Sequence, residues 1–133
     1  MAVKKRRRKR KKRYHIGTYI SSKTGQECKY RSGWELSYLR FLDSHAEVKS
    51  FVYEGVKIPY ISNVRTGKVR HYYPDFYVEF KDGSKQLVEI KPKKRVPQVA
   101  IQKKLKAAEV WCLEHGVRLV VLTEVELSSM GIL

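Results

Sequence analysis

The sequence predicts a single α/β domain whose core elements follow the order α-β-β-β-α-β. Two segments carry apolar residues at helical spacing, one after Ser32 and one ending at His115, and the other segments are rich in β-branched and aromatic residues. A chain of 133 residues with 42% hydrophobic residues is long enough for one core. Residues 32–133 are therefore predicted to form the domain, residues 14–31 an extended lead-in, and residues 1–13 a disordered basic arm.

The first helix is predicted within the segment SGWELSYLRFLDSHA. Ser32 and Glu35 have the S-x-x-E spacing of a capping box, which marks the start of a helix. Glu35, Leu39, Leu42 and Ala46 share one face of that helix. Glu35 heads this inward face, so its carboxylate is expected to lean toward the sheet.

The remaining elements follow from turn residues and apolar runs. Two β-rich runs, VKSFVYEGVKIPYI and VRHYYPDFYVEF, flank a predicted hairpin turn, SNVRTGK. KDGS is the next turn, QLVEIK is the following strand, and Pro92 ends it. The second helix, from about Gln98, ends before Gly116, a favourable C′ residue. Its inward stripe is formed by Ile101, Leu105, Ala108 and Cys112. VRLVVLT is a continuous apolar run, which is typical of a fully buried strand.

Positive charge is concentrated near the start of the chain. The formal net charge is +16, and residues 4–13, KKRRRKRKKR, supply ten of those charges. Such a run cannot bury apolar surface and repels itself, so it predicts a disordered arm. Nucleic-acid binding is the favoured interpretation, with a nuclear address and a membrane-surface contact as alternatives. The arm's phosphate contacts would come from Lys4, Lys5, Arg6, Arg7, Arg8, Lys9, Arg10, Lys11, Lys12 and Arg13.

The composition excludes several classes of protein. The basic arm has no apolar residue and cannot be a signal peptide. No segment approaches the roughly 18 apolar residues that span a bilayer. Cys28 and Cys112 match no zinc-ligand spacing, and Cys112 is interpreted as a buried reduced thiol. A soluble protein from a reducing compartment is expected.

Charged residues stand at the ends of two otherwise apolar strands. Asp75 opens the segment DFYVEF, and Glu89 and Lys91 close QLVEIK. A three-residue loop at 82–84 would pair Asp75 with Lys91 and Tyr77 with Glu89, whereas a two-residue loop would send Asp75 to the other side. We expect the first register, which places Asp75, Glu89 and Lys91 on one face.

These residue types predict metal-dependent cleavage of a phosphodiester. Two close carboxylates repel each other unless a cation lies between them. Ligand sets made only of oxygen suit Mg²⁺ or Mn²⁺ rather than zinc, and such a metal can polarise a phosphoryl oxygen and activate water. Lys91 could orient that water or stabilise charge on the phosphate. Simpler alternatives stay open: Asp75 as a polar residue at a strand start, Glu89 and Lys91 as a solvated strand face, and Glu35 as a cap.

The segments around these residues resemble a known family. Glu35, the Pro-Asp pair at 74–75 and the Glu-Ile-Lys run at 89–91 resemble the PD-(D/E)xK nuclease signature. Five segments resemble head completion nucleases of T-even-like tailed phages and the catalytic domain of TnsA endonucleases: YRSGWELSYLRFLD, IPYISNVRTGKVRHYYPDFYVEF, LVEIKPKK, LKAAEVWC and VLTEVEL. The resemblance spans about residues 30–127. It implies a restriction-endonuclease-like αβββαβ core with a mixed central sheet flanked by helices.

The resemblance implies a role for each matching position. It assigns Mg²⁺, for which Mn²⁺ could substitute, to Glu35, Asp75, Glu89 and the backbone carbonyl of Ile90. Lys91 would be the catalytic lysine, and Gln102 matches a position where related nucleases place an accessory polar residue. Independently of the family, basic residues directly after the catalytic strand are expected to hold the DNA backbone without reading its sequence. They are Lys93, Lys94 and Arg95.

Two functions of different classes remain open. The first is a Mg²⁺-dependent DNA endonuclease, encoded by a phage and active in head completion or packaging. It would work in the cytoplasm of a bacterial host, free or associated with the virion, with capsid, portal or neck proteins as further partners. The second is a structural DNA-binding protein of the capsid or neck on a nuclease-derived fold. A dimeric junction-resolving enzyme is a third option, and the sequence leaves the oligomeric state open.

Overall fold

The computed structural model describes residues 16–133, so the predictions for the basic arm lie outside the described residues. The elements are, in order, β1 (Gly17–Ile20), β2 (Glu27–Tyr30), α1 (Gly33–Ser44), β3 (Val48–Tyr53), β4 (Ile58–Asn63), β5 (Lys68–Tyr72), β6 (Phe76–Phe80), β7 (Lys85–Ile90), the 3-10 helix η1 (Lys93–Arg95), α2 (Val99–His115), β8 (Arg118–Leu122) and α3 (Glu124–Ser129). Both predicted helices are confirmed as α1 and α2. Gly116 ends α2 in the left-handed conformation, at φ +65°.

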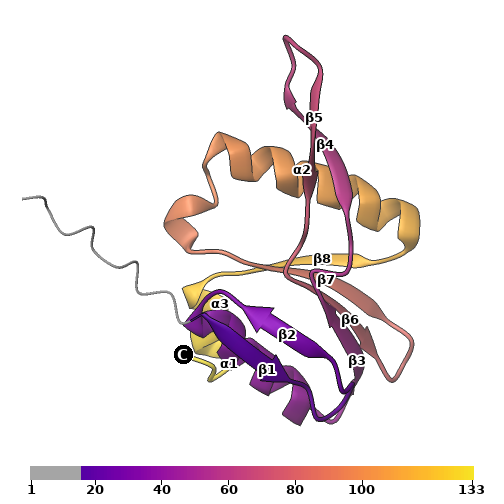
Figure 1. The fold of residues 1–133 in the computed structure, drawn as a ribbon, viewed down its shortest axis with the longest axis vertical. Coiled ribbons are helices and arrows are strands. Elements are labelled where there is room, and N and C mark those ends of the chain that lie inside the picture. The colour runs from indigo at the N-terminus through magenta and orange to yellow at the C-terminus, as the bar shows by residue number, and fades with distance from the viewer. Residues whose placement is uncertain (1–15) are drawn as a thin grey trace, which may run out of the picture.

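The central sheet is mixed, as predicted. Its strand order is β3-β6-β7-β8; the first three strands are antiparallel, and β8 runs parallel to β7. Alternate residues of β7 supply two cores. Val88 packs with Leu39 of α1, and Leu87 packs with Ala108 of α2. Helices therefore cover both faces, α2 on one and α1 with α3 on the other (Figure 1).

Each of the two predicted β-rich runs is divided into two strands. The first breaks at Glu54, which adopts a left-handed φ of 51°, and the second breaks at Pro74, which has no N–H to donate. The outer pieces, β4 and β5, pair with each other as a separate two-stranded sheet. The αβββαβ core is thus present, with the β4–β5 hairpin inserted between its first and second strands.

The predicted register of β6 against β7 is wrong by two residues. Tyr77 pairs with Leu87 and not with Glu89. Continuing the observed register places Asp75 opposite Glu89, where Lys91 was expected. Because the displacement is an even number of residues, Asp75, Glu89 and Lys91 keep the same face, as predicted.

The turn between these strands explains the difference. It lies at 81–83, one residue earlier than predicted, and is closed by Phe80 N donating to Ser84 O at 2.8 Å. Asp82 Oδ1 accepts from Ser84 N at 2.8 Å and from Ser84 Oγ at 2.6 Å. Gly83 takes the left-handed conformation, at φ +89°. The aspartate's local hydrogen bonds therefore select the turn position.

The lead-in is a β-hairpin tied to α1 and not a loose extended segment. β1 and β2 pair in register from Gly17 with Tyr30 onward. Asp43 of α1 accepts from Tyr19 Oη and Ser21 Oγ, both at 2.5 Å, and from Ser22 N at 3.0 Å. One carboxylate thus fixes the hairpin to the first helix.

Replacing Asp43 by alanine is expected to lower the free energy of unfolding by roughly 2 kcal/mol, because bonds to a charged acceptor are the stronger kind. Burial acts to raise the pKa of Asp43, but the bonds from Ser21, Tyr19 and two backbone amides hold it below its ordinary value. This stabilisation is therefore present above about pH 4 and is lost as the pH falls through the lowered pKa. Urea unfolding at pH 7 and pH 3 measures both effects. An equal loss for the exposed Glu47→Ala would contradict the prediction.

The last helix was not predicted. α3 follows its N-cap Thr123, whose hydroxyl and backbone form a capping box with Glu126, and it buries Leu127 completely. Cys28 and Cys112 are both free and buried, and burial raises the pKa of Cys112 to about 11. Of the helices in residues 16–133, none is long and apolar enough to cross a membrane.

Candidate active site

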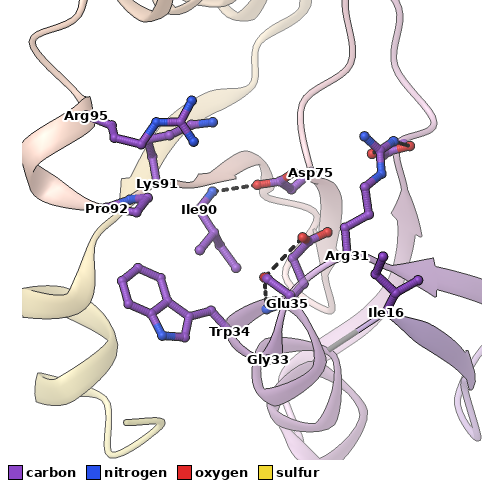
Figure 2. Close-up of a pocket in the computed structure, with 12 residues that line it drawn as sticks. Ile16, Arg31, Gly33, Trp34, Glu35, Asp75, Ile90, Lys91, Pro92 and Arg95 are labelled. Carbon is purple, nitrogen blue, oxygen red and sulfur yellow. Dashed lines mark hydrogen bonds and ion pairs between the residues drawn. The ribbon is translucent and has the colours of Figure 1, made fainter. Parts of the chain in front are cut away.

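A cleft of about 800 Å³ opens where β7 ends. Glu35, Asp75 and Lys91 are among its charged lining residues, and Trp34 and Pro92 form part of its apolar wall (Figure 2). α1, the segment before β6 and the segment after β7 each supply one of the charged residues. Three parts of the chain that are distant in sequence therefore meet at this edge of the sheet.

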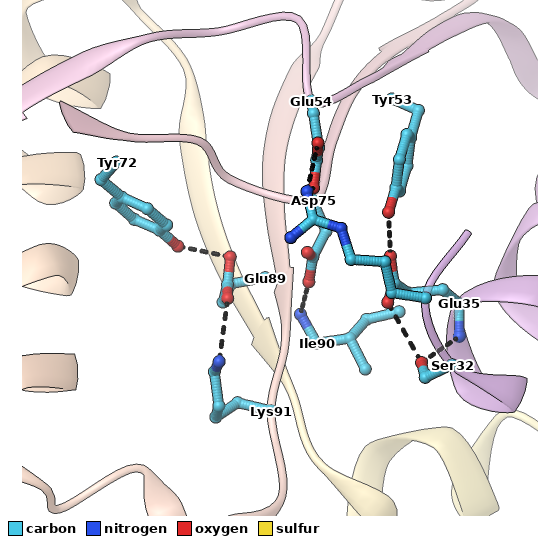
Figure 3. Close-up of polar contacts among 10 residues, drawn as sticks. Ser32, Glu35, Tyr53, Glu54, Tyr72, Asp75, Glu89, Ile90 and Lys91 are labelled. Carbon is cyan, nitrogen blue, oxygen red and sulfur yellow. Dashed lines mark hydrogen bonds and ion pairs between the residues drawn. The ribbon is translucent and has the colours of Figure 1, made fainter. Parts of the chain in front are cut away.

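Glu35 enters the site from the first turn of α1. Ser32 Oγ accepts from Glu35 N at 3.2 Å, which confirms Ser32 as the helix cap. The Glu35 carboxylate accepts from Ser32 Oγ at 3.2 Å and not from the Ser32 backbone N–H, so the predicted capping box is only half formed. The Tyr53 hydroxyl donates to Glu35 Oε1 (Figure 3). The side chain is buried, with 9% of its surface exposed. Capping thus holds the backbone of Glu35, while two hydroxyls orient its carboxylate.

Asp75 is held by the backbone of the neighbouring strand. Its Oδ2 accepts from Ile90 N at 2.7 Å (Figure 3). Burial raises the pKa of Asp75 well above its ordinary value, and the charges of Glu89 and Glu35 raise it further. The Ile90 bond and Lys91 act in the opposite direction without reversing the shift. The protein therefore holds this carboxylate near other negative charge, where a cation would relieve the repulsion.

Glu89 lies behind the cleft, between a tyrosine and the lysine. The Tyr72 hydroxyl donates to Glu89 Oε2, and Lys91 Nζ lies 3.6 Å from Glu89 Oε1 (Figure 3). Burial raises the pKa of Glu89, although both of these contacts act to lower it. Burial likewise raises the pKa of Tyr72, so its hydroxyl stays a hydrogen-bond donor. The side chain of Lys91 is only 18% exposed, its ammonium points toward Glu89, and the residue also lines the cleft (Figure 3).

The chemistry of the donors suits a hard divalent cation. Glu35, Asp75 and Glu89 offer oxygen only. Burial raises the pKa of Asp75 and of Glu89, and the charges of Glu89 and Glu35 raise that of Asp75 further. Their oxygens are turned toward hydroxyl, amide and ammonium donors of the protein. Within residues 16–133, no three acidic, histidine or cysteine side chains already form a closed ligand group. The chemistry of these donors is compatible with a hard divalent cation, which stays a prediction.

The predicted backbone-binding residues lie beside the cleft. Lys93, Lys94 and Arg95 form η1, are exposed, and make no ion pair with any residue from 16 to 133. Arg95 lines the cleft directly. Gln102, in contrast, is exposed on α2 and donates to the Val96 carbonyl at 2.7 Å. It supports the segment that leads into α2 and does not line the cleft.

Several residues of the site were not identified from the sequence. Neither Tyr53 nor Tyr72 was predicted as a residue of the site. At the cleft wall, Arg31 Nη2 donates to both carboxylate oxygens of Glu54, at 2.6 Å to Oε1 and 2.8 Å to Oε2. Of these unidentified residues, only Trp34 had a signal in the sequence, because it is adjacent to the predicted site residue Glu35. The other contacts join separate elements, so no local pattern marks them.

Two comparisons with known proteins give a family match and a similar protein. Residues 45–124 match the family described as TnsA-like endonuclease N terminal. The chain is also 32% identical to the head completion nuclease of Enterobacteria phage T4 over 124 residues, which cover 77% of this chain and 82% of that protein. The family match includes Asp75, Glu89 and Lys91, whereas Glu35 precedes it.

Proposed function

The chain belongs to the family of TnsA-like endonuclease N-terminal domains, and on that premise we propose that it is a Mg²⁺-dependent DNA endonuclease. The contact of Lys91 with Glu89 beside Asp75, at the edge of one cleft, is the observation that carries this proposal. A lysine held next to buried acids is costly unless it works on a substrate or offsets their charge. The similarity to a phage head completion nuclease supports a role in finishing or packaging phage heads.

Each residue of the site has a chemical part in the proposed reaction. Glu35, Asp75, Glu89 and the Ile90 carbonyl would hold Mg²⁺ or Mn²⁺, which supplies Lewis-acid polarisation of the phosphate and lowers the pKa of water. The Lys91 ammonium orients the attacking water or balances the charge that builds on the phosphate. Arg95 and Lys94 bind the flanking phosphates, and Tyr72 and Tyr53 fix the carboxylates. The basic run at 4–13 adds contacts with the DNA backbone that do not depend on sequence.

Cleavage of supercoiled and linear DNA with Mg²⁺, Mn²⁺ or EDTA tests the proposal. We expect nicking or cutting with either metal and none in EDTA. Tight DNA binding without cutting under any metal would contradict the proposal and favour the structural DNA-binding alternative. A four-way junction as a further substrate would show whether branched DNA is preferred.

Tyr72→Phe is expected to lower the cleavage rate about tenfold at pH 7, the effect of one hydrogen bond to a charged group. Without the Tyr72 hydroxyl the pKa of Glu89 rises further, because that bond acts to lower it. The acidic limb of the pH–rate profile should therefore move to higher pH, and the cleavage rate of the variant should approach that of the wild type as the pH rises. Tyr77→Phe is the matched control, since its hydroxyl makes no hydrogen bond within residues 16–133. An unchanged pH profile for Tyr72→Phe would refute the positioning role.

A further inference from the structure

We propose that the β4–β5 hairpin is a second DNA-binding surface, which contacts duplex phosphates beyond the cleft through the face that bears Lys68 and Arg70. The inference rests on the proposed function for its ligand, duplex DNA. It goes beyond that function because it assigns substrate contact to an element outside the nuclease core.

The hairpin projects from the body of the protein. It leaves the central sheet, passes over α2 and extends beyond that helix (Figure 1). Ile58 and Tyr72 at its base are buried, whereas all residues from 64 to 71 are exposed. A strand of six residues spans about 20 Å, which matches the length of roughly six base pairs. The hairpin could therefore follow a duplex over about half a turn.

All charged side chains of the hairpin are positive. Between 56 and 74 the chain has no Asp or Glu, and it contains Lys57, Arg65, Lys68 and Arg70. None of these side chains takes part in an ion pair with any residue of the described chain. Uncompensated positive charge on a projecting ribbon favours a polyanionic ligand.

The charged face leads to the acidic site. Lys68, Arg70 and Tyr72 alternate along β5 and so share one face. Tyr72 donates to Glu89 at the end of that face, and Lys104 Nζ of α2 lies 6.0 Å from the centre of the Tyr72 ring. The basic residues of β5 and α2 therefore lie close to the tyrosine that holds the site residue Glu89, so DNA bound at the site would pass near them.

The hairpin is held in place before any ligand binds. Lys103 Nζ of α2 donates to Ser62 O at 2.9 Å. At the tip, Asn63 Oδ1 accepts from Arg65 N at 2.9 Å, and Gly67 takes the left-handed conformation with φ +66°. A surface already ordered in the free protein loses little entropy on binding.

The opposite face of the hairpin fits a different class of partner. Ile61 and Val69 face each other there, and each is 55% exposed. A protein docked on that apolar pair would leave Lys68 and Arg70 uninvolved. DNA is favoured because the basic face, not the apolar one, carries the tyrosine that contacts the site residue Glu89.

The test compares two triple variants of the full chain by their binding to a labelled duplex in EDTA over a range of salt. Arg65→Gln/Lys68→Gln/Arg70→Gln removes the hairpin charges, and Lys81→Gln/Lys85→Gln/Arg118→Gln removes three charges from exposed positions where β7 and β8 begin. We expect the hairpin variant to lose at least tenfold in affinity at physiological salt and about 3 in the slope of log K against log salt. The control variant should lose much less. Equal losses of DNA affinity in the two variants would overturn the inference, and the opposite face with Ile61 and Val69 would then be the candidate surface for a protein partner.

A crosslinking experiment locates the contact directly. Both natural cysteines are buried, so a photo-crosslinker can be attached selectively to Arg65→Cys, with Lys85→Cys as the control site. DNA adducts at 65 and not at 85 are expected, and adducts of equal yield at both sites would overturn the inference. Hairpin-dependent binding in a protein that cuts no DNA would refute the proposed function alone. Cutting with hairpin-independent binding would refute this inference alone.

Discussion

Lys91→Ala is expected to lower DNA cleavage by about 10³-fold while folding and DNA binding persist. The magnitude is that of removing one preorganised electrostatic group from a reaction centre. Lys91 is suited to that role because its ammonium is mostly shielded from solvent and lies 3.6 Å from Glu89 Oε1. Single-turnover cleavage with saturating enzyme measures the chemical step, and binding in EDTA measures affinity separately.

Lys94→Ala is the matched control for this prediction. It removes the same charge three residues away, from an exposed position in η1 that has no ion-pair partner within residues 16–133. We expect it to weaken DNA binding modestly and to leave the single-turnover rate within about threefold, since it contributes a phosphate contact only. Comparable rate losses in both variants would show that Lys91 acts through general charge and not through its place beside Glu89.

The helices and the catalytic face were predictable because each depends on a robust local pattern. Ser32 and Gly116 mark helix ends through capping chemistry that operates within a few residues. The face shared by Asp75, Glu89 and Lys91 depends only on whether the strand offset is even. The shared face was therefore predicted correctly, although the predicted register was wrong by two residues.

Other parts of the fold depend on interactions that the alternation of polar and apolar residues does not reveal. Both β-rich runs have strand-like patterns throughout, yet the left-handed backbone at Glu54 and the missing N–H of Pro74 redirect the chain. Which sheet each piece joins is decided by packing on α2, so the β4–β5 hairpin was taken for part of the core. α3 had a readable signal, the Thr123–Glu126 capping box, but its six residues were too few for periodicity.

The acids could be found from the sequence, but not the tyrosines that bind them. Glu35 and Tyr53 are 18 residues apart and Glu89 and Tyr72 are 17 apart, on different elements. Each contact exists only after α1 and the hairpin base have packed against the sheet. A tyrosine in a strand is equally suited to a core, and its hydroxyl partner follows from tertiary structure alone.

Asp75→Asn is expected to stabilise the protein in the absence of divalent cations and to remove its stabilisation by them. Asparagine keeps an oxygen for the bond from Ile90 N but removes the charge that Glu89 and Glu35 repel. In EDTA at pH 8 we expect a gain of roughly 1 kcal/mol, the scale of one pKa unit, or a rise in Tm of about 4 °C. Wild-type protein should gain about 2.7 kcal/mol from Mg²⁺ at a hundred times its Kd, and the variant little.

The pH dependence of this effect follows from the raised pKa of Asp75. As the pH rises above about 4, the unfolded chain releases the Asp75 proton while the folded protein retains it, so the wild type loses stability up to the folded pKa. The advantage of Asp75→Asn should therefore be absent below about pH 4 and grow above it. Asp82→Asn removes the same charge from an exposed turn, where Ser84 holds the pKa of Asp82 low, and should give no such gain. If Mg²⁺ does not stabilise the wild-type protein, Asp75 does not bind the metal. If Asp75→Asn and wild type are equally stable in EDTA at every pH, Asp75 is not repelled by its neighbours.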